Sequence, residues 1–295
     1  MRLPRVRSPL WLKICITAYF LNASRPSRGE LSPLTFHLIN MIFTLDIGNS
    51  NIKLGVFDKN KLLTSYKISS SVGKTADEYC EVFVNLLTSA SIGINNIEGI
   101  IISSVKPSLN FTVERAVRHC FKKSPLIVSA KLKTNLKINT DNPEEVGADR
   151  LCDCVAALMK YKRSAIIASF GTATVFNVLT AKGEFLGGVI APGMKGSLDS
   201  LVNSAAKLPN IEIKTPPKVI AEDTVTNMQA GIVFGFTGLT EYIVARIKKE
   251  LNDDNALVIA TGGFADIIAG ETKVIDIVDK TLTLDGLNYL YQINK

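Results

Sequence analysis

The sequence has few of the residues that build metal sites, disulfide frameworks or redox centres. Its 295 residues include only five cysteines and two histidines, and no two cysteines form a C-x-x-C pair. A zinc site or a disulfide framework is therefore not expected, and the cysteine content suits a reducing cytosol. Cys152 and Cys154 fit small positions on a helix better than they fit metal ligands.

The sequence also lacks a basic run interleaved with aromatic residues. Of the net charge of +7, the first 40 residues supply +5, because they hold six Lys and Arg against Glu30 alone. The remaining chain carries 28 basic and 26 acidic residues, so nucleic-acid binding is not expected. An apolar share of 46% with 21% charged residues is typical of a globular protein, here long enough for two lobes.

A long hydrophobic run is missing as well. The stretch Leu10–Leu21 is too short to span a bilayer and Lys13 interrupts it, so no membrane partner is expected. Three arginines precede this stretch, which gives the outline of a signal or transit peptide. We favour a different interpretation, in which residues 1–40 are a disordered extension or no part of the mature fold, and Met41 is the working start. Secretion is the alternative.

From Met41 onward the pattern predicts two halves with the same order of elements. The first half has strands at 42–45, 52–57 and 62–68, a helix at 76–90, a strand at 99–103, a helix at 109–121 and a strand at 126–129. A helix at 148–161 follows. The order then restarts with strands at 165–168, 174–179 and 185–190, helices at 195–204 and 225–251, a strand at 257–260 and a short α/β unit. We place the two lobes at 41–154 and 155–295.

The first strand leads into the turn Asp46-Ile47-Gly48-Asn49-Ser50-Asn51, and Lys53 follows on the next strand. Backbone N–H groups, polar side chains and Lys53 can bind an anion there, and Asp46 can offer an oxygen to a phosphate-bound Mg²⁺. The turn is neither a Walker loop nor a G-x-G-x-x-G dinucleotide turn. An ordinary hairpin turn is the alternative interpretation.

Two further glycine-bearing corners follow strands in the second half. Phe170-Gly171-Thr172-Ala173-Thr174 can hold the β/γ end of a polyphosphate through N–H groups and the Thr172 hydroxyl. Thr261-Gly262-Gly263 lets a base or ribose approach the backbone closely. Each could be an ordinary hairpin or strand-to-helix turn. Three such corners in this order favour one nucleotide site in a cleft between two lobes.

The fourth motif is Gly147-Ala148-Asp149-Arg150, at the predicted start of a helix, where the partial positive charge favours an anion. Asp149 can accept a hydroxyl proton, and Arg150 can pair with the anionic end of an acceptor alcohol. The alternative is an Asp helix cap beside a surface Arg.

With these motifs the sequence resembles the type III pantothenate kinases, a family of the acetate kinase/sugar kinase/Hsp70/actin superfamily. The resemblance spans Met41–Asn294 and also rests on Ser103–Pro107, Gly187–Gly193 and Asn227–Gly231. It implies an α/β fold of duplicated ribonuclease H-like (actin-like ATPase) lobes with mixed sheets and an interlobe nucleotide cleft. It also implies ATP-dependent phosphorylation of pantothenate to 4'-phosphopantothenate, the first step of coenzyme A biosynthesis. The enzyme would be a cytoplasmic homodimer that uses Mg²⁺ and a monovalent cation, K⁺ or NH₄⁺, with dimerisation helices in the second lobe.

The resemblance also implies roles for single residues. Pantothenate would contact Gly147, Ala148, Asp149 and Arg150, with Asp149 as the proton acceptor, and Thr224 near the dimer interface. Contacts to ATP would come from Thr172 and from Asp46, Ile47, Gly48, Asn49, Ser50, Asn51, Ile52 and Lys53.

Two positions depart from the family pattern. Ser169 stands where the family has an aspartate that holds the monovalent cation, and Thr140 stands where a tyrosine commonly lines the pantothenate pocket. A unit charge about 4 Å away is worth roughly 4 kcal/mol at an effective dielectric near 20, so we infer a weakened or absent cation site. These departures motivate an alternative, a nucleotide- or pantothenate-binding regulator with weakened catalysis, although Asp46 and Asp149 are retained. Another small-molecule kinase of the superfamily is a third possibility, which the Val146–Arg150 segment disfavours.

Overall fold

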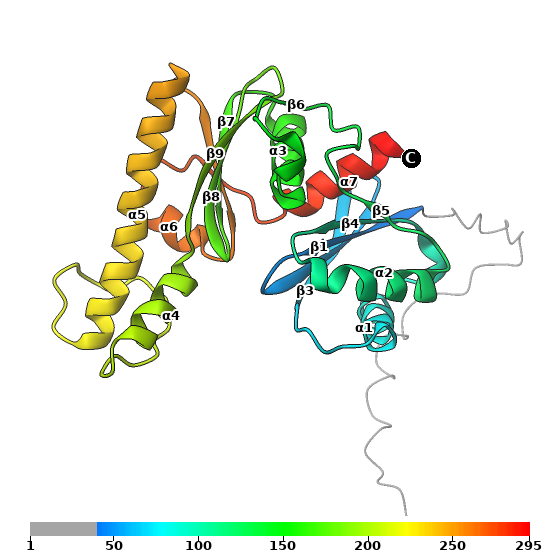
Figure 1. The fold of residues 1–295 in the computed structure, drawn as a ribbon, viewed down its shortest axis with the longest axis horizontal. Coiled ribbons are helices and arrows are strands. Elements are labelled where there is room, and N and C mark those ends of the chain that lie inside the picture. The colour runs from blue at the N-terminus through cyan, green and yellow to red at the C-terminus, as the bar shows by residue number, and fades with distance from the viewer. Residues whose placement is uncertain (1–39) are drawn as a thin grey trace, which may run out of the picture. The chain divides into compact units, whose positions relative to one another are not determined.

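A computed structural model of the protein describes residues 40–295 and shows two mixed β-sheets with helices packed on their faces (Figure 1). The prediction of an N-terminal extension falls on residues 1–40, which lie outside the described residues except for Asn40.

The first sheet has the strand order β3-β2-β1-β4-β5. Strand β1 pairs antiparallel with β2 and parallel with β4, so the turn after β1 and the end of β4 lie at the same edge. Helices α1 and α2 pack on one face of this sheet and enclose an apolar core (Figure 1). The elements are β1 (Met41–Ile47), β2 (Asn51–Asp58), β3 (Lys61–Ser69), α1 (Ala76–Ser89), η1 (Ile94–Asn96), β4 (Ile97–Ser104), α2 (Pro107–Phe121) and β5 (Leu126–Ile127).

The second sheet has the order β11-β10-β7-β8-β9-β6. Its strands β9-β8-β7-β10-β11 repeat the order and the pairing directions of the first sheet, with β7 antiparallel to β8 and parallel to β10. This confirms the predicted duplication. The strands are β6 (Lys137–Ile138), β7 (Ala165–Phe170), β8 (Ala173–Leu179), β9 (Glu184–Pro192), β10 (Leu257–Gly262) and β11 (Ile277–Val278).

Two helices connect the sheets. Helix α3 (Ala148–Tyr161) packs against α7 (Leu282–Asn294), and α7 also contacts β1, β2 and β4 of the first sheet. Helix α3 touches β4 as well as β7 and β8. The predicted lobe boundary after residue 154 falls inside α3 and stays a prediction. The remaining elements are η2 (Pro143–Glu145), α4 (Met194–Ser204), α5 (Thr224–Leu251) and α6 (Ala265–Glu271).

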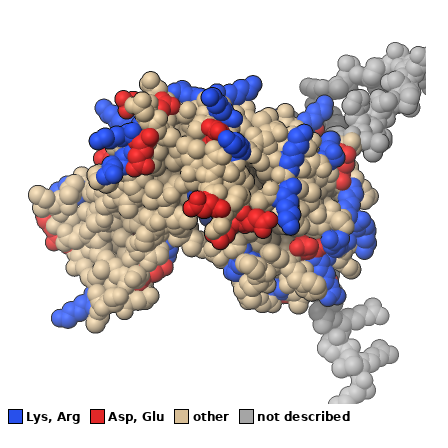
Figure 2. All heavy atoms as spheres, turned by 45° about the horizontal axis from the view of Figure 1, so that its top comes forward, with Lys and Arg blue, Asp and Glu red and all other residues tan. Residues whose placement is uncertain are grey.

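Helix α5 is long and apolar. Its 28 residues include an 18-residue window of mean hydropathy 1.3, of which 39% is buried, so by length and composition alone it could cross a membrane. The core helix of a globular protein passes the same test. Figure 2 shows one face of the molecule, on which Lys and Arg side chains are spread with acidic side chains between them.

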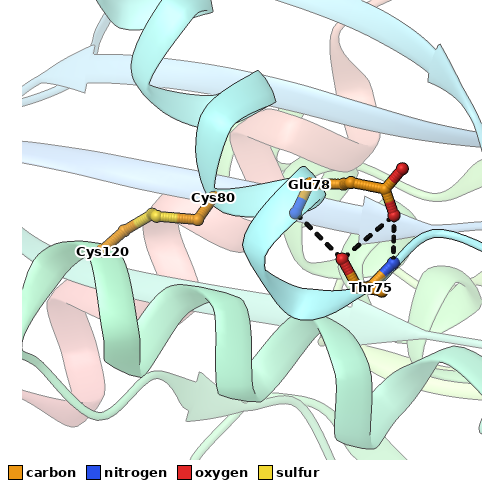
Figure 3. Close-up of a disulfide and its surroundings, with 4 residues drawn as sticks. All are labelled: Thr75, Glu78, Cys80 and Cys120. Carbon is orange, nitrogen blue, oxygen red and sulfur yellow. Dashed lines mark hydrogen bonds between the residues drawn. A yellow bond between two sulfur atoms is a disulfide. The ribbon is translucent and has the colours of Figure 1, made fainter.

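A disulfide framework was not expected, but the structure has one disulfide among the described residues, between Cys80 of α1 and Cys120 of α2 (Figure 3). They lie 40 residues apart in sequence, and no motif marks them, but the packing of α1 against α2 brings their Cα atoms to 5.6 Å. Cys152 and Cys154 are free and buried on α3, as expected. The start of α1 is fixed by a capping box in which Thr75 and Glu78 each bind the other's backbone N–H (Figure 3).

Reduction of this disulfide should lower the melting temperature by several degrees. In the chain-entropy account, a cross-link that closes a loop of this length is worth about 4 kcal/mol. Cys80→Ser should melt at the temperature of the reduced wild type and should not respond to dithiothreitol. Differential scanning fluorimetry with and without reductant makes the comparison. Mass spectrometry after alkylation that finds both thiols free in native protein would contradict the bond.

Candidate active site

The turn between β1 and β2 is closed by its own backbone. The N–H of Gly48 donates to the carbonyl of Asn51 at 2.9 Å, and a β-carbon at Gly48 would lie only 3.0 Å from that oxygen. The side chains of Ile47 and Ile52 are fully buried in the first core. These two predicted ATP contacts can therefore act only through their backbone groups, while Asn49 and Ser50 are exposed.

The structure brings the three glycine-bearing corners together. The hydroxyls of Ser50 and Thr172 lie 3.1 Å apart, although 122 residues separate them in sequence. The third corner meets the second, because the N–H of Phe264 donates to the carbonyl of Phe170 at 3.4 Å. Gly262 has a φ of +97°, and a β-carbon there would lie 2.5 Å from the same carbonyl. Only glycine permits this approach.

A lysine that sequence reasoning did not single out braces the first corner. The Lys106 ammonium donates to the carbonyls of Asn49 at 3.0 Å and Ser70 at 2.6 Å. The Ser70 hydroxyl donates to the same Asn49 carbonyl at 2.7 Å. The loop after β3 and the start of α2 thus hold the turn in place. The Ser103–Pro107 segment was recognised as part of the family pattern, but no role was assigned to Lys106.

Asp46 is a buried carboxylate with two partners. The Ser103 hydroxyl donates to its Oδ1 at 3.2 Å, and the Lys53 ammonium lies 3.5 Å from its Oδ2. Burial acts to lower the pKa of Lys53, but the charges of Asp46 and Asp153 outweigh it and the pKa is raised. Lys53 therefore stays protonated beside the turn that is predicted to bind phosphate, and a third of its side chain is exposed (33%).

Asp149 lies in the first turn of α3. Its Oδ1 accepts the N–H of Arg150 at 2.8 Å, and a β-carbon at Gly147 would lie 2.7 Å from the same oxygen, so glycine makes room for the carboxylate. Burial raises the pKa of Asp149, and the nearby negative charge of Asp46 raises it further. A carboxylate with a raised pKa is a stronger proton acceptor, which suits general base catalysis.

Arg150 is held away from the surface by two contacts. Its Nε donates to Oδ1 of Asn177 at 2.7 Å, and the guanidinium lies 5.3 Å from the centre of the Phe185 ring. Asn177 is fully buried, and its amide nitrogen has no hydrogen-bond partner among the described residues. The Thr140 hydroxyl oxygen is also buried without a partner in this part of the chain. Arg150 is therefore bound to a buried amide that keeps one unpaired donor, and a second unpaired polar atom lies at Thr140.

Two cavities adjoin the predicted pantothenate contacts. One, of about 380 Å³, is bordered by Ser104, Ser129, Glu145, Gly147 and Ala148, at the carboxyl ends of β4 and β5. The other, of about 430 Å³, is an apolar groove between α4 and α5 that includes Thr224. Gly147 and Ala148 border the first cavity and Thr224 borders the second, so the predicted pantothenate contacts are divided between two cavities.

Ser169 lies on β7, half-buried, directly beside Thr261 of β10. The Thr261 side chain is 1% exposed, and its hydroxyl has no hydrogen-bond partner among the described residues. The predicted position of the monovalent cation therefore has two neighbouring hydroxyl-bearing residues, Ser169 and Thr261, in this chain.

Asp153 and Thr283 complete the polar cluster, and sequence reasoning missed both. Asp153 follows Asp149 by one helical turn, so the i,i+4 spacing on α3 was a signal for a shared face. The Thr283 hydroxyl donates to Asp153 at 2.7 Å. No signal links Thr283 to Lys53, which lies 230 residues earlier in the chain.

The acidic residues fit a divalent cation that arrives with a polyphosphate. No group of three or more His, Cys, Asp or Glu side chains in residues 40–295 forms a cage of its own. Mg²⁺ typically takes one or two protein carboxylates and fills its remaining positions with waters and phosphate oxygens. The buried Asp46 carboxylate at the phosphate-binding corner matches that requirement.

The fold is shared with solved structures of low sequence identity. A protein described as a Baf family transcriptional activator from Campylobacter jejuni matches with a TM-score of 0.53 at 17% identity, over 85% of this chain and 98% of its own. A 2-dehydro-3-deoxygalactonokinase protein from Sinorhizobium meliloti matches with a TM-score of 0.50 at 11% identity, over 85% and 96%. These two matches show that the fold of this chain, with its two mixed sheets, is shared with those proteins.

Sequence relatives are much closer. A type III pantothenate kinase from Citrifermentans bemidjiense is 46% identical over 255 residues, which is 86% of this chain and all of the relative. The type III pantothenate kinase of Geobacter sp. (strain M21) is similar to the same extent, 46% over 255 residues. The family model described as type III pantothenate kinase matches residues 42–246. The chain therefore belongs to the type III pantothenate kinase family, and its activity is the ATP-dependent phosphorylation of pantothenate in coenzyme A biosynthesis.

Proposed function

We propose that Asp149 accepts the proton of the pantothenate hydroxyl while the three glycine-bearing corners hold the triphosphate of ATP. The observation that supports this most is the joining of the corners at Ser50 and Thr172, beside a carboxylate cluster. Asp46 and Lys53 both act on the pKa of Asp149, which indicates that phosphate-binding and acceptor-binding residues share one electrostatic environment.

In the proposed transfer of the γ-phosphoryl group, the attacking and leaving oxygens lie in line on opposite sides of the phosphorus. The hydroxyl oxygen of pantothenate attacks the γ-phosphorus, its proton passes to Asp149, and the bond from the γ-phosphorus to the β–γ bridging oxygen breaks to release ADP. Turn N–H groups and the Lys53 ammonium stabilise the charge that spreads over the phosphoryl oxygens. The divalent ion that accompanies ATP neutralises phosphate charge, and Asp46 is the residue that would hold it.

Acceptor binding is assigned to the start of α3 and its surroundings. Gly147 and Ala148 border a cavity large enough for a small acceptor, and Arg150 offers a fixed positive charge next to Asp149. The smaller Thr140, in place of the tyrosine common in the family, leaves its hydroxyl oxygen without a partner, which suits a contact to the acceptor.

Asp149→Asn should lower kcat at least about a hundredfold, because the amide keeps the shape of the side chain but cannot accept the proton. Asp254→Asn, at an exposed residue in the loop before β10 and at the end of that strand opposite Gly262, is the control and should keep wild-type turnover. A coupled assay with ATP, Mg²⁺ and pantothenate measures both variants. Turnover within threefold of the wild type in Asp149→Asn would remove Asp149 from this role.

We also propose a weakened monovalent-cation site at Ser169 and Thr261. Their hydroxyls can coordinate K⁺ or NH₄⁺, and the unpartnered Thr261 oxygen supports such a role, but neither hydroxyl carries the negative charge of the family aspartate. Cation binding should therefore be weaker than in relatives that have that aspartate.

Ser169→Asp should restore the missing charge and should raise either turnover or the response to K⁺. Activity measured over a K⁺ titration, with Na⁺ keeping the ionic strength constant, tests this. Superimposable titrations of the two proteins would show that position 169 does not bind the cation.

A homodimer is the proposed assembly. The apolar groove between α4 and α5 contains Thr224, and exposed apolar side chains lie on and near these helices, among them Leu201, Ile220, Val225 and Tyr242. Because Thr224 borders a different cavity from Gly147 and Ala148, we assign its predicted contact to pantothenate to a second copy. We also propose a cytoplasmic location, where ATP and pantothenate meet, although the Cys80–Cys120 bond is unusual there.

Sedimentation velocity should find a dimer at micromolar concentration. Val225→Asp should weaken it at least about tenfold, because a charge would be buried at the interface. Val84→Asp on α1 is the matched control, since its side chain is exposed to a similar extent (37% against 40%). A monomeric wild type, or equal dimer stability in the two variants, would contradict this interface.

A further inference from the structure

A chain of polar contacts runs from the phosphate-binding lysine into the buried helix pair. The Lys53 ammonium lies 3.5 Å from the Thr283 hydroxyl, and this hydroxyl donates to Oδ1 of Asp153 at 2.7 Å. The three residues come from β2, α7 and α3. Lys53 is thus held from one side by Asp46 and from the other by Thr283, which Asp153 orients.

Asp153 is an unusual residue for this position. Its side chain is buried (4% exposed), and no ion pair within 4 Å is found for it among residues 40–295. Burial raises the pKa of Asp153 to about 7, against the opposing effects of the Lys53 charge and the Thr283 hydrogen bond. A buried carboxylate with no direct cationic partner costs folding free energy, and an apolar residue would pack there more cheaply. Its presence therefore calls for a functional reason.

Competition between the Lys53 ammonium and a divalent cation for the Asp46 carboxylate provides such a reason. The Asp46 side chain is 7% exposed, and its Oδ2 faces the Lys53 ammonium at 3.5 Å, a longer separation than the 2.7–2.9 Å of a strong charge-assisted hydrogen bond. A divalent cation at Asp46 and a lysine paired tightly to Asp46 would compete for the same oxygen. A second anchor for the ammonium keeps Lys53 near the phosphates while it leaves Asp46 free for the metal.

We propose that Thr283 and Asp153 are positioning residues that hold Lys53 beside Asp46 rather than on it, so that the carboxylate can accept a divalent cation. The inference rests on the proposed role of Asp46 in holding that cation. Neither residue touches the reacting atoms, and both act through Lys53.

The test is the metal requirement of Thr283→Val, which removes the hydroxyl with little change in volume. The Mg²⁺ concentration for half-maximal activity should rise about tenfold, the size expected for one lost hydrogen bond to a charged group. The KM for pantothenate should not change. Thr283→Ser should restore the wild-type metal requirement, because it returns the hydroxyl.

Thr240→Val is the matched control. The Thr240 hydroxyl is equally buried but donates only to the Phe236 carbonyl within α5, so its loss should leave the metal requirement unchanged. If Thr283→Val is folded and its Mg²⁺ requirement equals that of the wild type, the proposal fails. The same holds if Thr283→Ser does not restore the wild-type value.

Isothermal titration calorimetry gives a readout that does not need catalysis. MgATP should bind Thr283→Val about tenfold more weakly than the wild type, whereas ATP without Mg²⁺ should bind within threefold of it. An equal loss of affinity for MgATP and for metal-free ATP would contradict the proposal. It would show that Thr283 orients Lys53 toward the phosphates but has no effect on the binding of Mg²⁺ at Asp46. If wild-type ATP binding gains nothing from Mg²⁺ at all, the metal role of Asp46 fails instead.

Melting temperatures measured over a pH series test whether Asp153 is a buried carboxylate with a raised pKa. The groups that act on its titration are Lys53, Thr283, Asp149 and Asp46. Because its pKa is near 7 when folded and near 3.8 when unfolded, the folded state holds this proton more tightly, and wild-type stability falls as pH rises between these values. Asp153→Asn does not titrate, so its melting temperature relative to the wild type should be higher at pH 8 than at pH 5. A difference that stays constant with pH would show that Asp153 is not the anchor described.

Discussion

The proposed nucleotide site requires two turns from opposite halves of the chain to meet, and they meet at the hydroxyls of Ser50 and Thr172, 3.1 Å apart. The turns follow β1 and β7, which hold the same place in the five-strand order that the two sheets share, so duplication of a single unit creates two equivalent corners. Glycine is required where backbones come this close. A β-carbon at Gly193 would lie 2.2 Å from the Thr172 carbonyl, and one at Gly262 would collide with Phe170.

The second organising feature is electrostatic. Asp46, Asp149 and Asp153 gather around one ammonium, that of Lys53, and each contributes to raising its pKa. The excess of negative charge makes burial costly, but it also suits the task. In the proposed mechanism it would attract a divalent cation with its polyphosphate. Burial and the charge of Asp46 raise the pKa of Asp149, the proposed proton acceptor. The cluster therefore favours function at a cost in folding free energy, and the burial of apolar side chains in the two neighbouring cores offsets that cost.

Elements with strong local patterns could be predicted from the sequence, and long-range contacts could not. The α3 helix was predicted residue for residue, because its apolar face repeats every three to four residues and Gly147 marks its start. The two-residue strand β6 was missed, since two residues carry no periodicity. Motif residues such as Asp46 and Thr172 were recognised from turn chemistry. The contributions of Lys106, Asn177 and Thr283 depend on packing between distant segments, as does the Cys80–Cys120 bond. The Ser103–Pro107 segment was recognised as a motif, but its contact with the turn after β1 could not be predicted from a single sequence.

The central claim is that three corners hold one triphosphate and direct it at the acceptor beside Asp149. A crystal structure of the enzyme with a non-hydrolysable ATP analogue, Mg²⁺ and pantothenate tests it most directly. The account predicts phosphate oxygens within hydrogen-bond distance of the Gly48–Asn51 turn and of Thr172, and the acceptor hydroxyl between Asp149 and the γ-phosphorus. A nucleotide bound away from either turn, or an acceptor hydroxyl out of reach of the Asp149 carboxylate, would contradict it.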